Sequence, residues 1–170
     1  YEPLRRIYFF FNKLFCFPFK FIIFYLIFTL HQSFSIVEYT GNSSYGQTVG
    51  HGLGVEPKLV IIKNRSNARN WRTYVSALGA TKYINLDESA AAGTYGSFND
   101  TLPTINVFST TSAGAADRAT NYPNDDYIAY CYADVANYQK VGAYVGNGST
   151  AGPIVTTGFE PAWVMIKEVA

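Results

Sequence analysis

The chain has 170 residues, of which 17% are aromatic and 15% are charged, and its formal net charge is +1. This length fits one ordinary domain, or one domain and part of another, and the near-zero charge provides no electrostatic basis for binding nucleic acid. The two cysteines, Cys16 and Cys131, are too few for a disulfide scaffold or a cysteine-rich zinc site.

Residues 1–36 form a hydrophobic segment whose composition differs from that of the remaining chain. They contain 10 of the 13 phenylalanines, and four basic residues against one acid give them a charge of +3. The apolar stretch Phe21–Leu30 is about half as long as the roughly 20 residues of a membrane-spanning helix. Three interpretations stay open: a translated non-coding upstream stretch, a secretory signal or signal anchor, and a genuine membrane helix. In all three, we expect this segment to stay apart from the downstream core.

From Val37 onward, short runs rich in Val, Ile, Thr and Tyr alternate with clusters of Gly, Asn, Ser and Pro. This pattern favours an all-β fold, an antiparallel β-sandwich of the jelly-roll type, with a barrel as the alternative. We expect strands at Ser35–Tyr39, Gln47–His51, Lys58–Lys63, Trp71–Val75, Lys82–Leu86, Ile105–Ser109, Tyr127–Ala133, Lys140–Val145, Pro153–Thr156 and Ala162–Lys167.

Two of these runs have the composition of central strands. Leu59–Ile62 is a continuous apolar run bounded by Lys58 and Lys63. Tyr127–Ala133 alternates large and small side chains, so its large residues share one face and its small residues share the other. Because Cys131 is on the small face, we interpret it as a buried apolar residue rather than a nucleophile.

An internal repeat is the most informative feature of the sequence. Tyr39–Lys63 and Tyr144–Lys167 both contain Tyr-x-Gly-Asn-x-Ser, then Gly-x-Glu-Pro, then an apolar run that ends in Lys. We expect a turn at the Gly-Asn-x-Ser sequence of each copy, where Gly and Asn tolerate positive φ angles. The prolines of the two copies lie 104 residues apart (161 − 57), a period that matches a sandwich domain and exceeds that of solenoids. We therefore expect a β-sandwich domain at residues 37–142 and the truncated start of a second repeat at 143–170. One pseudo-symmetric domain that uses both modules is the alternative.

Several motifs carry a resemblance to a known family. They are the Tyr39–Asn42 turn, His51–Gly54, Pro57 with Leu59–Lys63, Asn64–Ser66, Trp71, Leu78–Tyr83, Tyr127–Ala133 and Tyr144–Ser149. With them, residues 37–170 resemble an uncharacterised repeated β-domain of virion and tail-associated proteins of bacteriophages, notably marine phages. That domain often lies beside concanavalin- or laminin-G-like jelly-roll domains. The resemblance implies a structural or attachment role in a phage particle, and it implies no catalytic residues.

Three groups of titratable residues have a structural and a functional interpretation. We interpret His51, in His-Gly-Leu-Gly, as a turn or packing residue rather than a metal ligand. The adjacent acids Asp125 and Asp126 could contribute oxygen ligands to Ca²⁺, but they fit no spaced calcium loop, so a solvated loop is favoured. The basic stretch from Lys63 to Arg72 favours a surface loop and strand end over a nucleic-acid site.

These observations lead to three hypotheses. The first is a non-catalytic virion structural or tail-associated module, located in the virion, whose partners are other virion proteins or copies of itself. The second is a carbohydrate-binding module in which Tyr45 or the candidate ligand-binding residues Trp71, Tyr95 and Tyr122 stack on host-surface glycans. The third is an exported bacterial surface domain, secreted or at the cell surface. This third hypothesis, and any membrane contact, requires residues 1–36 to be genuine. We expect no enzymatic activity, no cofactor, no metal and no nucleic-acid partner.

Overall fold

The computed structural model describes residues 5–11, 33–94, 96–111 and 119–169, and these residues form ten strands and no α-helix. The strands are β1 (Arg5–Phe11), β2 (Phe34–Thr40), β3 (Gln47–Gly50), β4 (Leu59–Asn64), β5 (Arg72–Val75), β6 (Ile84–Asn85), β7 (Val107–Thr110), β8 (Asp126–Tyr132), β9 (Gln139–Val145) and β10 (Trp163–Glu168). A short 3-10 helix, η2 (Ser76–Leu78), follows β5. All the strand pairs are antiparallel, so the predicted all-β antiparallel class is confirmed.

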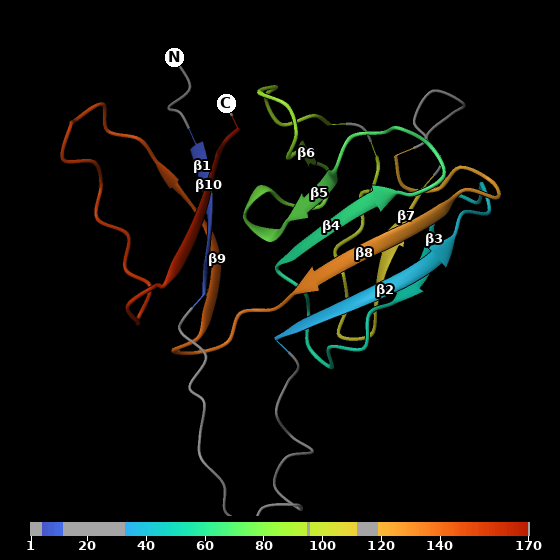
Figure 1. Ribbon diagram of the computed structural model, residues 1–170, viewed down its shortest axis with the longest axis horizontal. Helices are drawn as coiled ribbons and strands as arrows, with labels where there is room; N and C mark the ends of the chain where they lie inside the picture. The colour runs from blue at the N-terminus through green and yellow to red at the C-terminus, as the bar shows by residue number, and fades with distance from the viewer. Residues whose placement is uncertain (1–4, 12–32, 95, 112–118, 170) are drawn as a thin grey trace, which may run out of the picture.

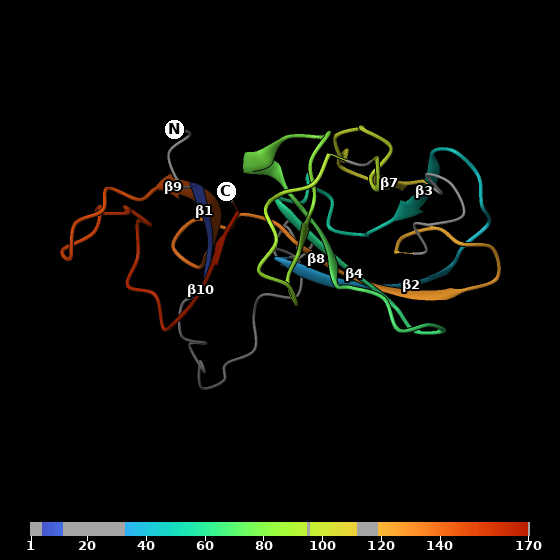
Figure 2. The same ribbon diagram turned by 90° about the horizontal axis from the view of Figure 1, so that it is seen from above.

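The strands form three sheets. The largest has the order β2-β8-β4-β5-β6, the second pairs β3 with β7, and the third has the order β10-β1-β9. Figure 1 shows β8 running between β2 and β4, and β1 running between β9 and β10. Figure 2 shows β3 and β7 in a separate layer from β2, β4 and β8, as in a sandwich.

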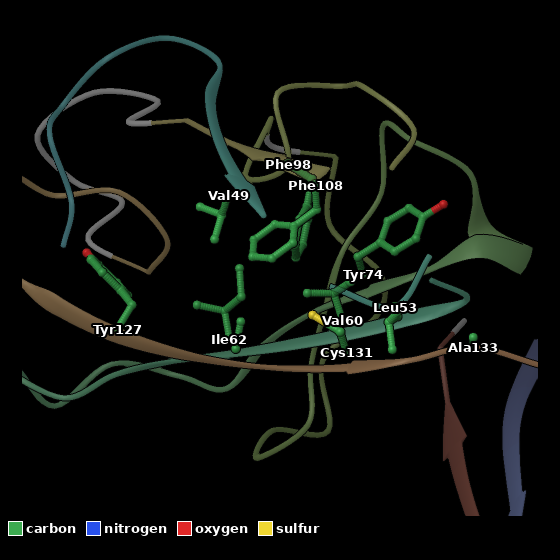
Figure 3. Packing of buried hydrophobic residues seen from close by; sticks show 11 residues of the cluster. Val49, Leu53, Val60, Ile62, Tyr74, Phe98, Phe108, Tyr127, Cys131 and Ala133 are labelled. Carbon is green, nitrogen blue, oxygen red and sulfur yellow. The ribbon is translucent and has the colours of Figure 1, made fainter. Parts of the chain in front are cut away.

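The main core lies between the five-stranded sheet and the β3-β7 layer (Figure 3). Val60, Ile62 and Cys131 point from the large sheet toward Val49 and Phe108 of the β3-β7 layer, and all five are buried. The alternation predicted for β8 is confirmed, since Tyr127, Ala129 and Cys131 are fully buried while the residues between them are half-buried. Burying these apolar side chains contributes about 25 cal/mol per Å² of area removed from water.

A second core cluster joins the three-stranded sheet to the opposite face of the large sheet. Ile7, Phe9 and Val141 of this three-stranded sheet, which we call the small sheet, pack with Leu59 and Val75 of the large sheet, and all five are buried. Leu59 therefore supports the second cluster while its neighbour Val60 supports the first, which explains why β4 is a continuous apolar run.

The expectation that residues 1–36 stay apart from the core is wrong for two parts of that segment. β1 is the central strand of the small sheet, and Phe34–Ile36 begin β2. The physical reason is that an aromatic, extended run has a high propensity for strands and can bury Ile7 and Phe9 while β9 and β10 satisfy its backbone. The apolar stretch Phe21–Leu30 lies outside the described residues.

The two repeat modules have the same strand arrangement. β2 and β4 of the first module flank β8, and their counterparts β9 and β10 flank β1. The registers also correspond: Tyr39 lies opposite Tyr127, and its counterpart Tyr144 lies opposite Arg6. The β4–β8 and β10–β1 pairs give the same correspondence, so each residue of β1 precedes its β8 counterpart by 121 positions (127 − 6). In the second module, β1 thus stands where β8 stands in the first.

The turns of the two modules have matching backbone geometry. Asn42 Oδ1 accepts the N–H of Ser44 at 2.9 Å, and Asn147 Oδ1 accepts the N–H of Ser149 at 3.0 Å. The left-handed residue in each turn is the one after the Gly and the Asn, Ser43 in one copy (φ 65°) and Gly148 in the other (φ 69°). The reason is that the Asn side chain closes the turn, which leaves the next residue to reverse the chain.

The expected strand at Pro153–Thr156 is wrong. These residues are not in a strand, and Ile154 is 96% exposed. The corresponding part of the first module is β3, which exists as a strand because it pairs with β7. Among the described residues, the second module has no counterpart of β7, so its apolar run has no strand to pair with.

Candidate functional site

The candidate site lies on the face of the five-stranded sheet that points away from the main core. Strand alternation puts Phe34 and Ile36 of β2 on this face, opposite Tyr132 and Tyr130 of β8. The three-stranded sheet packs against one end of this face, next to Leu59. The other end is uncovered within the described part of the chain, and we call it the open face. It carries Phe34, Ile36, Tyr130 and Trp71, the residue immediately before β5.

Six aromatic rings make a continuous series of contacts across this face and onto the small sheet. We call this series the aromatic row; in order, it consists of Trp71, Tyr130, Phe34, Tyr132, Phe9 and Trp163. The centroid distances along the row are 6.3, 6.4, 4.7, 4.6 and 5.9 Å. These separations are those of favourable aromatic pairs. The two tryptophans of the chain stand at the two ends of the row.

The row is at least partly exposed except at Phe9, which the contact between the two sheets buries. Trp71 is 36% exposed, Phe34 is 37% exposed and Trp163 is 48% exposed, whereas Phe9 is buried. Near the first end the planes of Trp71 and Tyr130 differ by 25°, and those of Tyr130 and Phe34 by 11°. The open face therefore carries three nearly parallel rings, of which Trp71 and Phe34 are exposed beside Ile36 and Tyr130 is half-buried between them.

Charged side chains border the open face. The ammonium of Lys63 lies 5.7 Å from the ring centroid of Trp71, a cation–π distance, and it also donates a hydrogen bond to the backbone oxygen of Arg69. The guanidinium of Arg65 donates to the carboxylate of Glu38. Lys63 and Arg65 of the basic stretch thus lie at the rim of an apolar patch, where they can supply hydrogen-bond donors. The expectation of a surface position is wrong for Arg72, which is buried with its guanidinium 3.7 Å from the ring centroid of Tyr83.

The structure separates the four aromatic candidates proposed from sequence. Trp71 belongs to the aromatic row, whereas Tyr95 lies outside the described residues. Tyr122 is half-buried in the loop before β8, and its backbone N–H donates to Tyr127 Oη at 2.8 Å. Tyr45 is 80% exposed, in the turn before β3, with no ring contact found for it in the described part of the chain.

Sequence reasoning missed five members of the row. The alternation of β8 places Tyr130 and Tyr132 on one face, so these two were within reach of sequence analysis. The contacts of Phe34 and Phe9 join positions far apart in the sequence, since Phe34 is 98 positions from Tyr132 (132 − 34) and Phe9 is 154 positions from Trp163 (163 − 9). Only the pairing of β2 with β8 and the insertion of β1 beside β10 bring them into contact.

His51 and Cys131 are structural residues, as predicted. The ring of His51 is buried, with Nε2 3.1 Å from the backbone oxygen of Thr104, and Nδ1 accepts the N–H of Leu53 at 3.2 Å. Burial lowers the pKa of His51, and the hydrogen bond with Thr104 opposes that effect. Burial raises the pKa of the Cys131 thiol to about 12, so the nucleophilic thiolate is disfavoured.

The acidic pair divides between two environments. Asp126 is exposed, as predicted, but it begins strand β8 and is not part of a loop. The interpretation is wrong for Asp125, which is buried because the side chains of Asn64 and Asn67 donate to its carboxylate at 2.8 and 3.0 Å. These amide donors satisfy the carboxylate oxygens that a cation would otherwise bind. Among the described residues, no three His, Cys, Asp or Glu side chains lie together as a metal site would require.

Comparison with known protein families identifies the family of this chain. A family model described as a domain of unknown function, DUF7483, matches residues 29–170, which is 142 of the 170 residues and includes both repeat modules. The chain belongs to this family. No curated protein and no solved structure matches the chain. Within the described residues, no helix has the length and apolar character needed to cross a membrane.

Proposed function

We propose that this DUF7483 domain is a non-catalytic jelly-roll-like β-sandwich module of a bacteriophage particle, and that it attaches to host-surface glycans through the open face. The observation that carries the proposal is the set of nearly parallel rings of Trp71, Tyr130 and Phe34, exposed at Trp71 and Phe34 beside Ile36 and bordered by charged side chains. Exposed apolar patches with polar rims commonly mark binding sites.

A glycan fits the chemistry of this face. A sugar ring has an apolar face of C–H groups, which can lie on an aromatic ring, and hydroxyl groups at its edge, which need hydrogen-bond partners. The open face supplies the rings, and Lys63, Arg65 and Glu38 supply donors and an acceptor at the rim. The Trp71–Tyr130 stack holds both rings in place before the ligand arrives, which reduces the entropy lost on binding.

The non-catalytic part of the proposal rests on the state of the two side chains with the most obvious chemical reactivity. Both ring nitrogens of His51 are engaged in hydrogen bonds inside the fold, and Cys131 is fully buried with a raised pKa. The assignment to a phage particle rests on the resemblance of residues 37–170 to repeated virion domains. In that setting, the module would contact other virion proteins or copies of itself.

Glycan binding can be tested with immobilised bacterial surface polysaccharides. We expect the purified full chain to bind one or more of them, and the bound glycan to change the fluorescence of the two tryptophans. The variant Trp71→Phe, which keeps Trp163 as the sole reporter, would show whether the signal arises at the open face. Absence of binding to all the polysaccharides at high protein concentration would contradict the glycan part of the proposal.

The particle assignment needs a separate test. Mass spectrometry of purified phage particles should detect peptides from residues 37–170, and immuno-electron microscopy should place them at the tail or another surface. Absence of these peptides from particles would overturn the virion role and leave the glycan test unaffected.

A second candidate function is an exported bacterial surface domain with the same glycan-binding face. The apolar stretch Phe21–Leu30, preceded by basic residues, favours this alternative because it has the order of parts found in a secretory signal. A mature protein whose first residue lies near Ser35–Val37, found by N-terminal sequencing, would support export and argue against the phage assignment.

A further inference from the structure

In the small sheet, β1 occupies the central position between β9 and β10. β9 and β10 make no direct ladder with each other, and both pair with β1. Without β1, each would present an edge of unpaired backbone N–H and C=O groups to the other. The second module is thus a slot for one strand, and β1 fills it in the register that β8 has in the first module.

β1 differs from β8 in how it is attached to the rest of the chain. β8 is embedded in the large sheet, with described chain on both sides. β1 has no pairing partner in the large sheet, and residues 12–32 connect it to β2. Those 21 residues (32 − 12 + 1) can span up to about 70 Å when extended, which exceeds the width of a small domain.

The contacts of β1 do not depend on which copy of the chain provides it. Ile7 and Phe9 are buried by side chains of β9, β10 and the large sheet, and Arg6 pairs with Glu168 at 3.4 Å. A second copy's β1 would make the same backbone ladders and the same side-chain contacts. Exchange of an identical element between copies therefore keeps the local contacts and needs only a connection long enough to reach.

We propose that the slot between β9 and β10 is a strand-exchange site, and that copies of this chain associate when β1 of one copy fills the slot of another. The occupant is the aromatic strand Arg5–Phe11 of a second copy, which has the extended form that the slot requires and buries Ile7 and Phe9 in it. This inference does not depend on the glycan-binding proposal, and either can fail without the other.

Cysteine crosslinking across the slot tests the exchange directly. Arg6 and Glu168 lie opposite each other in the β1–β10 pair, both partly exposed, and residues opposite each other in antiparallel strands have Cα separations suited to a disulfide. Two full-length chains, one with Arg6→Cys and one with Glu168→Cys, both in a Cys16→Ser background, are mixed, denatured, refolded together and oxidised.

A matched control uses a strand pair that we do not expect to exchange. Thr40 and Asp126 lie opposite each other in the β2–β8 pair, and their side chains are joined by a 3.0 Å hydrogen bond. Chains with Thr40→Cys and Asp126→Cys are treated in the same way. A single chain with both Arg6→Cys and Glu168→Cys checks that β1 lies in the stated register.

We expect the mixture of Arg6→Cys and Glu168→Cys chains to give at least about tenfold more disulfide-linked dimer than the control mixture gives. The yield of this dimer should increase with protein concentration. The double variant should crosslink within one chain at low concentration. A yield equal to that of the control would overturn the exchange, and a double variant that fails to crosslink would overturn the slot itself.

Discussion

Trp71 and Tyr130 stack across a strand that separates them. Trp71 immediately precedes β5, Tyr130 lies on β8, and β4 runs between these strands, yet the ring centroids are 6.3 Å apart with planes 25° from parallel. Lys63, on the intervening strand, holds its ammonium 5.7 Å from the Trp71 centroid. The stack therefore fixes a half-exposed tryptophan in one orientation, which is the property expected of a binding platform and is not required for the core.

Substitution of Trp71 should separate binding from folding. For Trp71→Ala, we expect at least about a tenfold loss of affinity for any polysaccharide that the chain binds, because a large aromatic anchor contributes roughly 1.4 kcal/mol or more at such a site. Tyr45→Ala is the matched control, since Tyr45 is 80% exposed and lies outside the aromatic row. Isothermal titration calorimetry measures both affinities, and circular dichroism verifies the fold. Equal affinities for the two variants would remove the open face from the proposed function.

Gly41 should be intolerant of any side chain. A Cβ at this position would lie 2.0 Å from the backbone oxygen of Tyr122, and the neighbouring backbone is fixed because Gly41 exchanges hydrogen bonds with residues 124 and 125. We expect Gly41→Ala to lower the free energy of unfolding by about 1–3 kcal/mol or more. Gly50→Ala, whose Cβ would lie 4.0 Å from the nearest atom, is the control. Urea denaturation compares the two, and similar midpoints would contradict the close approach.

Tyr127 provides a hydroxyl that a buried network requires. Its Oη accepts the backbone N–H of Tyr122 at 2.8 Å and lies 3.3 Å from Asn64 Nδ2, which also donates to Asp125. Tyr127→Phe keeps the ring and removes this acceptor, so we expect a loss of about 1–3 kcal/mol in the free energy of unfolding. Tyr45→Phe, at an exposed site, should change it by less than about 0.5 kcal/mol. If Tyr127→Phe leaves the free energy of unfolding unchanged, the network contributes little to stability.

Local alternation was enough to predict the central strands. The period of two in β8 separates Cys131 from Tyr130, and the continuous apolar run of β4 reflects its burial on both faces. These features depend on each strand's own residues, so they can be read before any partner is known. Trp71 was also identifiable as a candidate, but the row that contains it was not.

The errors in the sequence analysis involve pairing between distant segments. The composition of residues 5–11 differs from that of the body and predicts a segment outside the core, yet a strand needs only a suitable edge, and β9 and β10 provide two. Pro153–Thr156 has the composition of a strand and lacks a partner. Asp125 was assigned to a solvated loop because its amide donors are 58 and 61 residues away. In each case, the deciding contact is non-local.

His51 should make the fold sensitive to acid. Burial lowers its pKa below the ordinary value of 6.5, so the unfolded chain binds the proton more tightly than the folded chain does. The stability contribution is therefore complete above pH 6.5 and is lost as the pH falls through the lowered pKa. Protonation would also place a hydrogen on Nδ1, which now accepts the N–H of Leu53. Urea midpoints measured between pH 7.5 and pH 5 should fall for the native chain. His51→Gln should show a smaller fall; an identical fall in both would exclude His51 as the cause.

Phe9 provides the most direct test of whether β1 belongs to the fold. Its ring is buried, it lies 4.6 Å from the centroid of Tyr132 on the large sheet and 5.9 Å from that of Trp163 on β10, and it thus joins two sheets. We expect Phe9→Ala to lower the free energy of unfolding by about 3–5 kcal/mol, because it removes a large buried side chain and leaves a cavity. Ile154→Ala is the control, since Ile154 is 96% exposed and its loss should change stability by less than about 0.5 kcal/mol.

Both variants are made in a Trp71→Phe background, so that fluorescence reports on Trp163 beside the cavity while circular dichroism reports on all the strands. A loss below about 1 kcal/mol for Phe9→Ala would mean that the large sheet is stable without β1. A full loss seen by both probes would mean that the two sheets unfold together, since only a shared core lets one side chain on β1 destabilise strands of both.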